Sequence, residues 1–416
     1  MKRRVVITGM GCVSPYGTGA EKAWEAVLNG KSGIKKLSLD ISKHLVHIGG
    51  EVPEINVEEY VDPKEAKRLD KFILFPLIAA LEAQKDGNFD MSKENPFRTG
   101  VIIGSAQGGL YTMTQSHETM LSRGYNKCSP FTVPMMIPNM AAGKISIKLG
   151  AKGVNKAVAT ACATGAHAIG DAFRSIQWGD ADVIFAGGSD SKITDFGIGA
   201  FTSARTLSKR NDEPEKASRP YDKDRDGFVM SEGAAVLMLE ELEHAKARGA
   251  KIYAEIAGYG QSADAYDFVA PDPNGAGAEY AILSAINDAG ITKEDIDYIN
   301  MHGTSTHVGD IAESKTVERI FGDKDKNKKL LVSSTKSMTG HMLGAAGAIE
   351  ALFAVETTIH DVVPPTINLD EQDEEVANLD YVPNKARKHR VNYALSNSFG
   401  FGGCNAVLIF KKYQEQ

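Results

Sequence analysis

The chain has 416 residues, and its 47 lysines and arginines against 54 aspartates and glutamates give a formal net charge of −7 at pH 7. Hydrophobic residues make up 42% of the chain and charged residues 24%, which excludes wholesale disorder and fibrous repeats. A net negative chain binds nucleic acid poorly unless its cations cluster, so we expect no nucleic-acid partner. The length exceeds what one hydrophobic core usually serves and favours two fused halves.

We expect neither a membrane span nor a disulfide framework. The longest apolar stretch, residues 72–81, is interrupted by Pro76 and reaches only about half of the ~20 residues that a membrane helix needs. The cysteines have no CxxC spacing, which favours a cytoplasmic protein with reduced thiols. They are Cys12, Cys128, Cys162 and Cys404.

Short β-branched runs alternate with helical patterns along the chain, which is typical of α/β layers. The expected strands are residues 4–8, 100–104, 157–161, 182–187, 234–239, 298–301, 330–333 and 406–410. The expected helices, in which apolar residues recur at helical spacing, are residues 163–178, 279–288 and 344–358.

A weak internal repeat predicts two related halves. A strand, a reactive-looking residue and a Gly/Ala-rich helix occur at residues 158–170 and again at 332–350. We therefore divide the chain into residues 1–250 and 251–416. The lysine-rich residues 324–329 in the second half predict a solvated loop.

Two motif-like segments do not carry the function that they imitate. Residues 222–227 look like the start of a calcium-binding EF-hand loop, but the bidentate Glu belongs at position 12 and Glu232 falls at position 11. We expect a charged structural turn and no metal. Gly9 and Gly11 follow a strand as in a dinucleotide-binding loop, but Ser14 occupies the third glycine position.

Cys162 lies at the predicted junction between a strand and a helix, in a run of small residues. Unpaired amides and the positive end of the helix dipole are expected to stabilise its thiolate, and the small neighbours leave room for a substrate. A buried, inert cysteine is the alternative. The residues around Cys162 leave both interpretations open.

His302 and His341 each follow a predicted strand. Sites assemble at strand ends in α/β folds, and histidine supplies hydrogen-bond donors or proton transfer near neutral pH. Either residue alone fits a structural histidine equally well. Residues 399–405 add a glycine-flanked aromatic segment that can act as a gate.

Together these segments resemble the elongating β-ketoacyl-acyl-carrier-protein synthases, specifically the type II enzymes of bacterial fatty-acid synthesis, over essentially the whole chain. The resemblance is carried by residues 5–9, the Cys162 motif, and residues 219–229, 302–306, 336–347 and 397–403. It implies an α/β thiolase-like fold, five-layered αβαβα and built from two similar halves, usually in a homodimer. It also implies that the acidic turn is structural.

The resemblance assigns a mechanism to the reactive residues. Cys162 would accept an acyl chain from an acyl carrier protein as a thioester. His302 and His341 would promote decarboxylation of malonyl carrier protein, and the carbanion would attack the thioester to give a chain two carbons longer. The amides of Cys162 and Phe401 would form an oxyanion hole, and Phe401 would gate the acyl pocket.

The resemblance also implies supporting residues. Thr304 and Thr306 would hold the pantetheine arm, and no metal or organic cofactor is required because phosphopantetheine arrives on the carrier protein. A charged network would orient the histidines. Its members are Lys336, Asp310, Glu313 and Glu350.

An acidic carrier protein needs basic residues to dock on, and an ordinary solvated face is the alternative. The docking candidates that the resemblance gives are Lys64, Lys67, Arg68, Lys127 and Arg205.

Four positions depart from the family pattern. Gln107 stands where an apolar residue usually lines the acyl pocket, and burying its amide unpaired would cost about 1–3 kcal/mol. Asp267 and Val269 replace a usual His and Thr, and Cys404 replaces a small or polar residue. The preferred chain length and the carrier protein are therefore left open.

Three other functions compete. A ketosynthase of a specialised polyketide or polyene pathway is the nearest, because of Gln107 and the altered loop. A thiolase acting on acyl-CoA, with Cys404 as its second cysteine, is more distant, since thiolases pair one histidine with two cysteines. A silent partner subunit is not expected to retain Cys162, His302 and His341 together.

Overall fold

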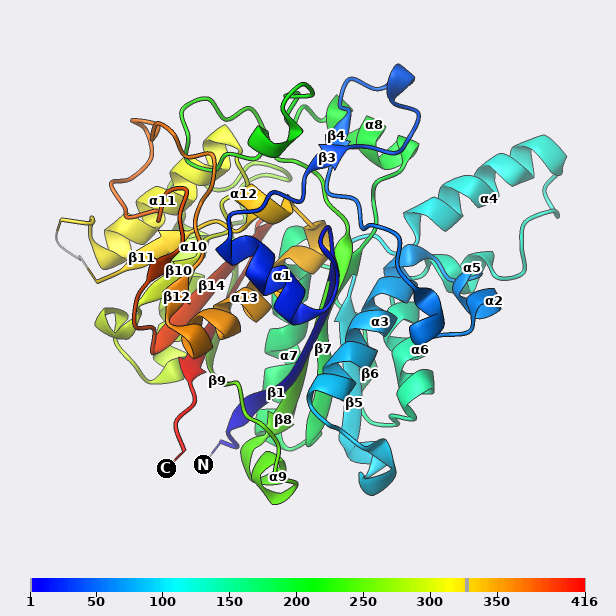
Figure 1. The fold of residues 1–416 in the computed structure, drawn as a ribbon, viewed down its shortest axis with the longest axis horizontal. Coiled ribbons are helices and arrows are strands. Elements are labelled where there is room, and N and C mark those ends of the chain that lie inside the picture. The colour runs from blue at the N-terminus through cyan, green and yellow to red at the C-terminus, as the bar shows by residue number, and fades with distance from the viewer. Residues whose placement is uncertain (1, 326–328, 416) are drawn as a thin grey trace.

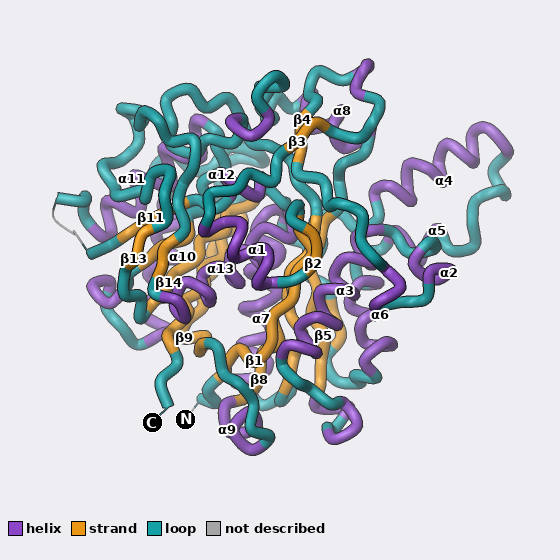
Figure 2. Tube along the Cα trace, viewed as in Figure 1, coloured by secondary structure: helices purple, strands orange, loops and turns teal. Residues whose placement is uncertain are grey.

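The computed structural model describes residues 2–325 and 329–415, so the middle of the predicted 324–329 loop lies outside the described residues. Within them, the main sheet has the order β11-β10-β14-β15-β9-β1-β8-β7-β5-β6, and β2 pairs with β1. Figure 2 shows this sheet as a central band with helices on both sides. No helix in the described part is long and apolar enough to cross a membrane.

The strands of the first half are β1 (Val5–Ser14), β2 (Gly17–Thr18), β5 (Thr99–Gly104), β6 (Asn155–Lys156), β7 (Val183–Asp190) and β8 (Gly233–Glu241). Those of the second half are β9 (Ala254–Ala263), β10 (Tyr298–Asn300), β11 (Leu331–Ser333), β14 (Tyr393–Gly400) and β15 (Cys404–Lys412). Two small hairpin-like sheets pair β3 (Lys35–Lys36) with β4 (Ile48–Gly49) and β12 (Val362–Val363) with β13 (Arg387–Lys388).

The helices of the first half are α1 (Ala20–Leu28), α2 (Pro63–Ala66), α3 (Lys71–Asp86), α4 (Leu110–Arg123), α5 (Thr132–Met136), α6 (Met140–Leu149), α7 (Thr164–Trp178), α8 (Asp195–Ser203) and α9 (Leu242–Ala247). Those of the second half are α10 (Ala276–Ala289), α11 (His307–Phe321), α12 (Lys336–Thr339) and α13 (Ala346–His360).

The two halves of the main sheet join only where Val5–Ile7 of β1 pair with Ala254–Ile256 of β9. Helices α7 and α13 pack on each other between the halves, α3 and α6 cover the outer face of the first, and α10 and α11 lie over the outer face of the second (Figure 1). Helices and half-sheets therefore form five alternating layers. This confirms the expected thiolase-like architecture.

Both faces of both half-sheets are buried, which explains why the strands read as continuous apolar runs. In β8, Ala235, Leu237 and Leu239 face the central helices, whereas Val236 and Met238 face α3. The same alternation recurs in β15. There Ala406, Leu408 and Phe410 face inward, and Val407 and Ile409 face the outer helices.

Paired glycines let one helix lie directly on the first strand of each half. A Cβ on Gly9 or Gly11 of β1 would lie 2.2 or 2.1 Å from a backbone oxygen of α3. A Cβ on Gly258 or Gly260 of β9 would lie 2.3 or 2.0 Å from a backbone oxygen of α10. The sequence pattern did not predict β9, because Gly258 and Gly260 interrupt its β-branched run.

One expected strand is wrong. Only Asn155 and Lys156 pair with β5, and residues 157–160 run beside it without a ladder, with Ser105 N donating to Val158 O over 3.1 Å. The ladder ends because the chain turns there into the short 3-10 helix Ala161–Ala163.

The acidic turn is a structural one, as expected. The Asp222 carboxylate accepts hydrogen bonds from Arg219 Nε at 2.9 Å and from the backbone amides of Asp370 and Glu371 at 2.9 and 3.1 Å. It therefore ties the turn to a distant segment of the second half.

A buried charge cluster at the base of β8 generates a test of stability. His244 Nδ1 lies 2.6 Å from Glu240 Oε1 and its Nε2 lies 2.9 Å from Glu94 Oε2, while Arg248 Nε donates to Glu240 over 2.7 Å. The hydrogen bond with Glu240 raises the pKa of His244 above 6.5.

We expect His244→Gln to destabilise the protein by about 1 kcal/mol below pH 6.5. Because the folded-state pKa is raised, this contribution is complete below the unfolded pKa and is lost as the pH rises through the folded pKa. Urea unfolding at pH 5.5 and 8.5 measures it. An equal loss at both pH values would contradict the account.

Candidate active site

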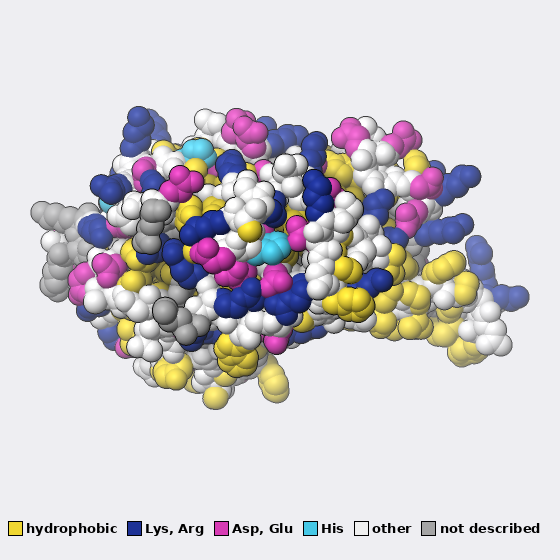
Figure 3. Space-filling model, turned by 90° about the horizontal axis from the view of Figure 1, so that it is seen from below, with side chains coloured by type: hydrophobic (Ala, Val, Ile, Leu, Met, Phe, Trp, Pro, Cys, Tyr) yellow, Lys and Arg dark blue, Asp and Glu magenta, His cyan; other side chains and the backbone are white. Residues whose placement is uncertain are grey.

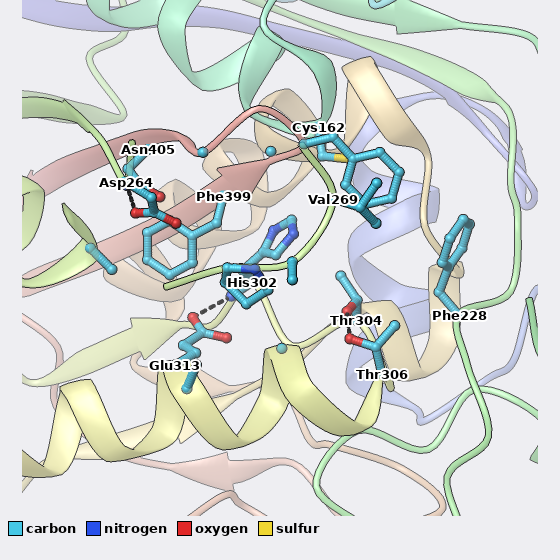
Figure 4. Close-up of a pocket in the computed structure, with 18 of the residues that line it drawn as sticks. Cys162, Phe228, Asp264, Val269, His302, Thr304, Thr306, Glu313, Phe399 and Asn405 are labelled. Carbon is cyan, nitrogen blue, oxygen red and sulfur yellow. Dashed lines mark hydrogen bonds between the residues drawn. The ribbon is translucent and has the colours of Figure 1, made fainter. Parts of the chain in front are cut away.

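One pocket brings together the residues on which the sequence analysis converged. It is lined by side chains from the start of α7, the loop after β10, the segment after α12 and the turn between β14 and β15 (Figure 4). The predicted residues on its wall are Cys162, His302, His341, Thr304, Thr306, Glu313 and Phe401. The pocket also contains aromatic residues that sequence reasoning did not single out, Phe201, Phe228 and Phe399.

Cys162 lies in the 3-10 helix that leads into α7, and only 8% of it is exposed. The turn is tight, because Ala161 takes a left-handed φ of 49°. Gly400 passes so close that a Cβ there would lie 3.1 Å from the Cys162 amide nitrogen. The backbone of the β14–β15 turn is therefore packed against the nucleophile.

Burial opposes the thiolate that the helix start was expected to stabilise. Burial raises the pKa of Cys162 to about 12; Lys336 and the hydrogen bond from the Phe401 amide oppose the rise, and the carboxylates of Asp190 and Glu350 add to it. The helix start was expected to lower this pKa, but burial outweighs that arrangement.

His302 and His341 face each other in the pocket, with ring centroids 5.5 Å apart and planes at 86°. Burial and the charge of Lys336 lower the pKa of both well below 6.5, so both rings are neutral at pH 7. Phe228 packs edge-on against His341 at 5.2 Å, and Phe399 lies 5.8 Å from His302. The aromatic walls thus fix both imidazoles.

Lys336 decides which nitrogen of His302 carries the proton. Its Nζ lies 3.4 Å from His302 Nδ1 and pairs with Glu350 in a fully buried contact. An ammonium group has only donors, so Nδ1 accepts and the N–H remains on Nε2. Burial raises the pKa of Glu350 to about 7, against the opposing charge of Lys336.

Glu313 and Asp310 act on the backbone of the His302 loop instead of on the rings. Glu313 accepts from the amides of His302 and Gly303 at 2.7 and 2.8 Å and from Asn397 Nδ2 at 3.0 Å. Asp310 accepts from the Ser305 amide at 3.2 Å. The expected charged network therefore has two parts, one at the rings and one at the loop.

Thr304 and Thr306 sit opposite Cys162 across the pocket, and their hydroxyl oxygens lie 2.9 Å apart (Figure 4). Thr306 directly precedes α11, so the two hydroxyls are held at a helix start. They offer polar contacts along one wall.

The gate segment is bonded to the loop that departs from the family pattern. Gly402 N donates to Phe268 O over 2.8 Å, and Asp264 N donates to Gly403 O over 2.9 Å. Phe401 directly precedes these two contacts and lies on the pocket wall. Val269 also lines the pocket, while the Asp267 carboxylate turns back to the amides of residues 269 and 270 at 2.8 and 2.9 Å.

Two of the departures lie off the wall of this pocket in the single chain. Gln107 is exposed and does not line the pocket, because β5 ends at Gly104 and the loop after it turns outward. Cys404 packs against the core between the two half-sheets, on the side of β15 away from the pocket. It is therefore not placed as a second catalytic cysteine.

All five docking candidates are exposed. Lys64, Lys67 and Arg68 lie on or just after α2, and the Arg68 guanidinium lies 6.0 Å from the Phe131 ring in the α4–α5 segment that also carries Lys127. Arg205 lies just after α8, a helix that Figure 1 shows apart from α2.

The comparisons with known proteins agree with this geometry. The model of the β-ketoacyl synthase N-terminal domain matches residues 2–245, and that of the C-terminal domain matches residues 253–370. A 3-oxoacyl-[acyl-carrier-protein] synthase 2 of Vibrio cholerae is 49% identical over 413 residues, covering 99% of both chains.

Solved structures extend the likeness to the fold. A β-ketoacyl synthase from Burkholderia phymatum has a TM-score of 0.91 at 34% identity, covering 100% of both chains. A ketosynthase structure with a type II polyketide acyl carrier protein has a TM-score of 0.90 at 32% identity, again over 100% of both chains. With two family models covering most of its length and a relative at 49% identity, the chain belongs to the β-ketoacyl synthase family.

Proposed function

We propose that this protein is an elongating 3-oxoacyl-[acyl-carrier-protein] synthase of type II fatty-acid biosynthesis, an acyltransferase that lengthens an acyl chain by two carbons. The observation that carries the proposal is the convergence of Cys162, two neutral histidines and the Phe401 amide in one pocket. The 49% identity to 3-oxoacyl-[acyl-carrier-protein] synthase 2 over the full chain supports the pathway.

The first half-reaction moves the acyl group onto Cys162. The sulfur attacks the acyl-carrier thioester, the carbon–sulfur bond to the carrier breaks, and the thiol proton is transferred to the departing pantetheine sulfur. Because the resting group is a thiol with a raised pKa, charge develops on sulfur only during attack. The amides of Cys162 and Phe401 stabilise the tetrahedral oxyanion.

The second half-reaction uses the histidines as donors. Nε2–H of His302 and the N–H of His341 bond the thioester oxygen of malonyl carrier protein as carbon dioxide leaves and enolate charge develops. The carbanion then attacks the carbonyl carbon of the Cys162 thioester, the bond from that carbon to the Cys162 sulfur breaks, and the β-ketoacyl product leaves on the carrier. The released sulfur takes up a proton from water, which restores the thiol. A neutral imidazole suits this role because it donates without adding an ion to a dry pocket.

The carrier protein supplies both substrates, so no resident cofactor enters the scheme. Thr304 and Thr306 bind the pantetheine arm, which reaches Cys162 along their wall of the pocket. Basic residues around α2 and the α4–α5 loop receive the acidic carrier, with Arg205 as a further contact. All four cysteines are free, which is consistent with a reducing cytoplasm.

We assign the active form as a homodimer. Apolar side chains gather at the end of the molecule that carries α4, which Figure 1 shows projecting from the body and Figure 3 shows from below. Of the residues of α4, only Leu110 is buried. The exposed apolar side chains of α4, of α5 and of the segment between them include Tyr111, Met113, Leu121, Tyr125, Phe131 and Val133. A second copy would cover such a surface.

A ketosynthase of a specialised polyketide pathway is the second candidate. The chemistry is identical, and the favouring observation is the altered 264–271 loop, which places Val269 on the pocket wall. The two candidates differ in the acyl chains that they accept.

Incubation with acyl carrier proteins of four to sixteen carbons and malonyl carrier protein tests the proposed function. We expect Cys162 to be acylated, seen as an intact-mass increase, and long chains to be elongated. Cys162→Ala abolishes both. Acylation confined to short or unsaturated chains would favour the polyketide candidate, and no acylation of any chain would contradict both.

The neutral histidines predict a pH dependence. In Cys162→Ala, which cannot be acylated, we expect malonyl-carrier decarboxylation to stay constant from pH 8 down to pH 6, because the lowered pKa values keep both donors neutral. Lys336→Met removes a charge that lowers these pKa values. The pH below which the decarboxylation rate falls should therefore be higher in this variant.

Carbon dioxide release, followed across this pH range, makes that measurement. The control is Lys412→Met, which removes a lysine whose pairing with Asp361 lies far from the pocket. A rate that already halves near pH 6.5 in the protein with Lys336 intact would overturn the assignment of neutral donors.

A further inference from the structure

A second buried ion pair lies beside the pocket and takes no part in the steps above. Lys192 and Asp190 both have side chains that are 0% exposed, and Lys192 Nζ lies 3.1 Å from Asp190 Oδ1. Removing two charges from water costs several kcal/mol per ion before the pairing offsets it. A pair in this position is therefore a weak source of stability, and its contacts indicate another role.

Asp190 joins segments that are far apart in the chain. It ends β7, and its Oδ1 accepts from the Ser105 hydroxyl at 2.9 Å, just after β5. Its Oδ2 accepts from the Gly344 amide at 2.7 Å and from the Ala106 amide at 3.3 Å. One carboxylate thus ties the first half-sheet to the 3-10 turn Leu343–Ala345 of the second half.

Lys192 holds the other end of the same loop. Its Nζ donates to Gly108 O over 2.8 Å. The loop of residues 105–109, which carries Gln107, is therefore bonded to both members of the ion pair. On its far side Gly109 N donates to Met136 O over 3.1 Å, so the loop is clamped between Lys192 and α5.

The junction has no space to absorb a shift. A Cβ on Gly344 would lie 2.6 Å from Asp190 Oδ2 and 2.8 Å from the Ala106 nitrogen, and a Cβ on Gly108 would lie 2.3 Å from Met136 O. A change in the ion pair must therefore move either the 105–109 loop or the Leu343–Ala345 turn.

Leu343 connects this junction to the reacting sulfur. It lines the pocket, and it belongs to one apolar cluster with Cys162, Phe228, Ile193 and Ile198. The wall formed by the histidines and threonines is polar, so an alkyl chain attached to Cys162 is received by this apolar cluster. Ile193 directly follows Lys192, so the ion pair and the apolar wall share one segment.

We propose that Asp190 and Lys192 are positioning residues that set acyl-chain specificity, by holding Leu343 and the 105–109 loop at a fixed place relative to Cys162. The ligand class is the alkyl chain of an acyl thioester. The proposal rests on the proposed ketosynthase function. The malonyl unit, which reacts against His302 and His341, does not use this wall.

The variant Lys192→Met tests the proposal, since it keeps the length of the side chain and removes the ammonium. We expect the kcat/KM for acylation of Cys162 by sixteen-carbon acyl carrier protein to fall at least roughly tenfold relative to the four-carbon substrate, because small misplacements cost large factors in rate. We expect malonyl-carrier decarboxylation to stay within about twofold, since its donors are untouched.

A double variant, Asp190→Asn with Lys192→Met, provides the test if the single variant does not fold. It leaves no unpaired buried charge, and the altered chain-length ratio should persist in it. The control Lys412→Met removes a lysine–aspartate pair on β15 and should leave the ratio unchanged.

A uniform loss of acylation at every chain length would overturn the positioning role and leave only a structural one. An unchanged ratio in both variants would overturn it as well. If the unmodified protein is not acylated by any carrier, the proposed function itself has failed, so the two failures are distinguishable.

Discussion

The active site depends on one buried contact, the ammonium of Lys336 between the Glu350 carboxylate and Nδ1 of His302. A buried lysine without such partners would be costly, and its position gives three effects at once. It fixes the tautomer of His302, it lowers the pKa of both histidines, and it opposes the rise in the pKa of Cys162. The charge of Lys336 therefore influences the protonation of both histidines and of Cys162.

The fold places that charge by packing two similar half-sheets around α7 and α13. Cys162 comes from the 3-10 helix before α7 in the first half, whereas both histidines and Lys336 come from the second. The pocket exists only where the halves meet. This explains why the close glycine contacts at Gly344 and Gly400 join segments distant in sequence. A change in the packing of either half would therefore alter the position of the Cys162 sulfur relative to the histidines.

Much of this could be predicted from sequence, because reactive residues that follow strands converge in α/β folds. Cys162, His302 and His341 were found in that way, Lys336 was implied by the family resemblance, and the four lie together. The pKa of Cys162 could not be predicted, since it depends on burial and on Asp190, which no local pattern places beside it.

Other features could not be predicted from the sequence, for similar reasons. Gln107 is exposed in the single chain, and its place in the turn after β5 could not be predicted from a local pattern. Asp190 and Lys192, two residues apart at a strand end, read as an ordinary solvated pair until their burial is known. Strand β9 was missed because its glycines, which admit α10, break the pattern of alternating apolar residues.

The most direct test of the central claim is the protonation state of the two histidines, read from nitrogen-15 chemical shifts of labelled protein. The account predicts that His302 and His341 are neutral at pH 7, that His302 carries its proton on Nε2, and that Lys336→Met raises both pKa values. An imidazolium signal from either ring at pH 7, or a proton on Nδ1 of His302, would contradict it.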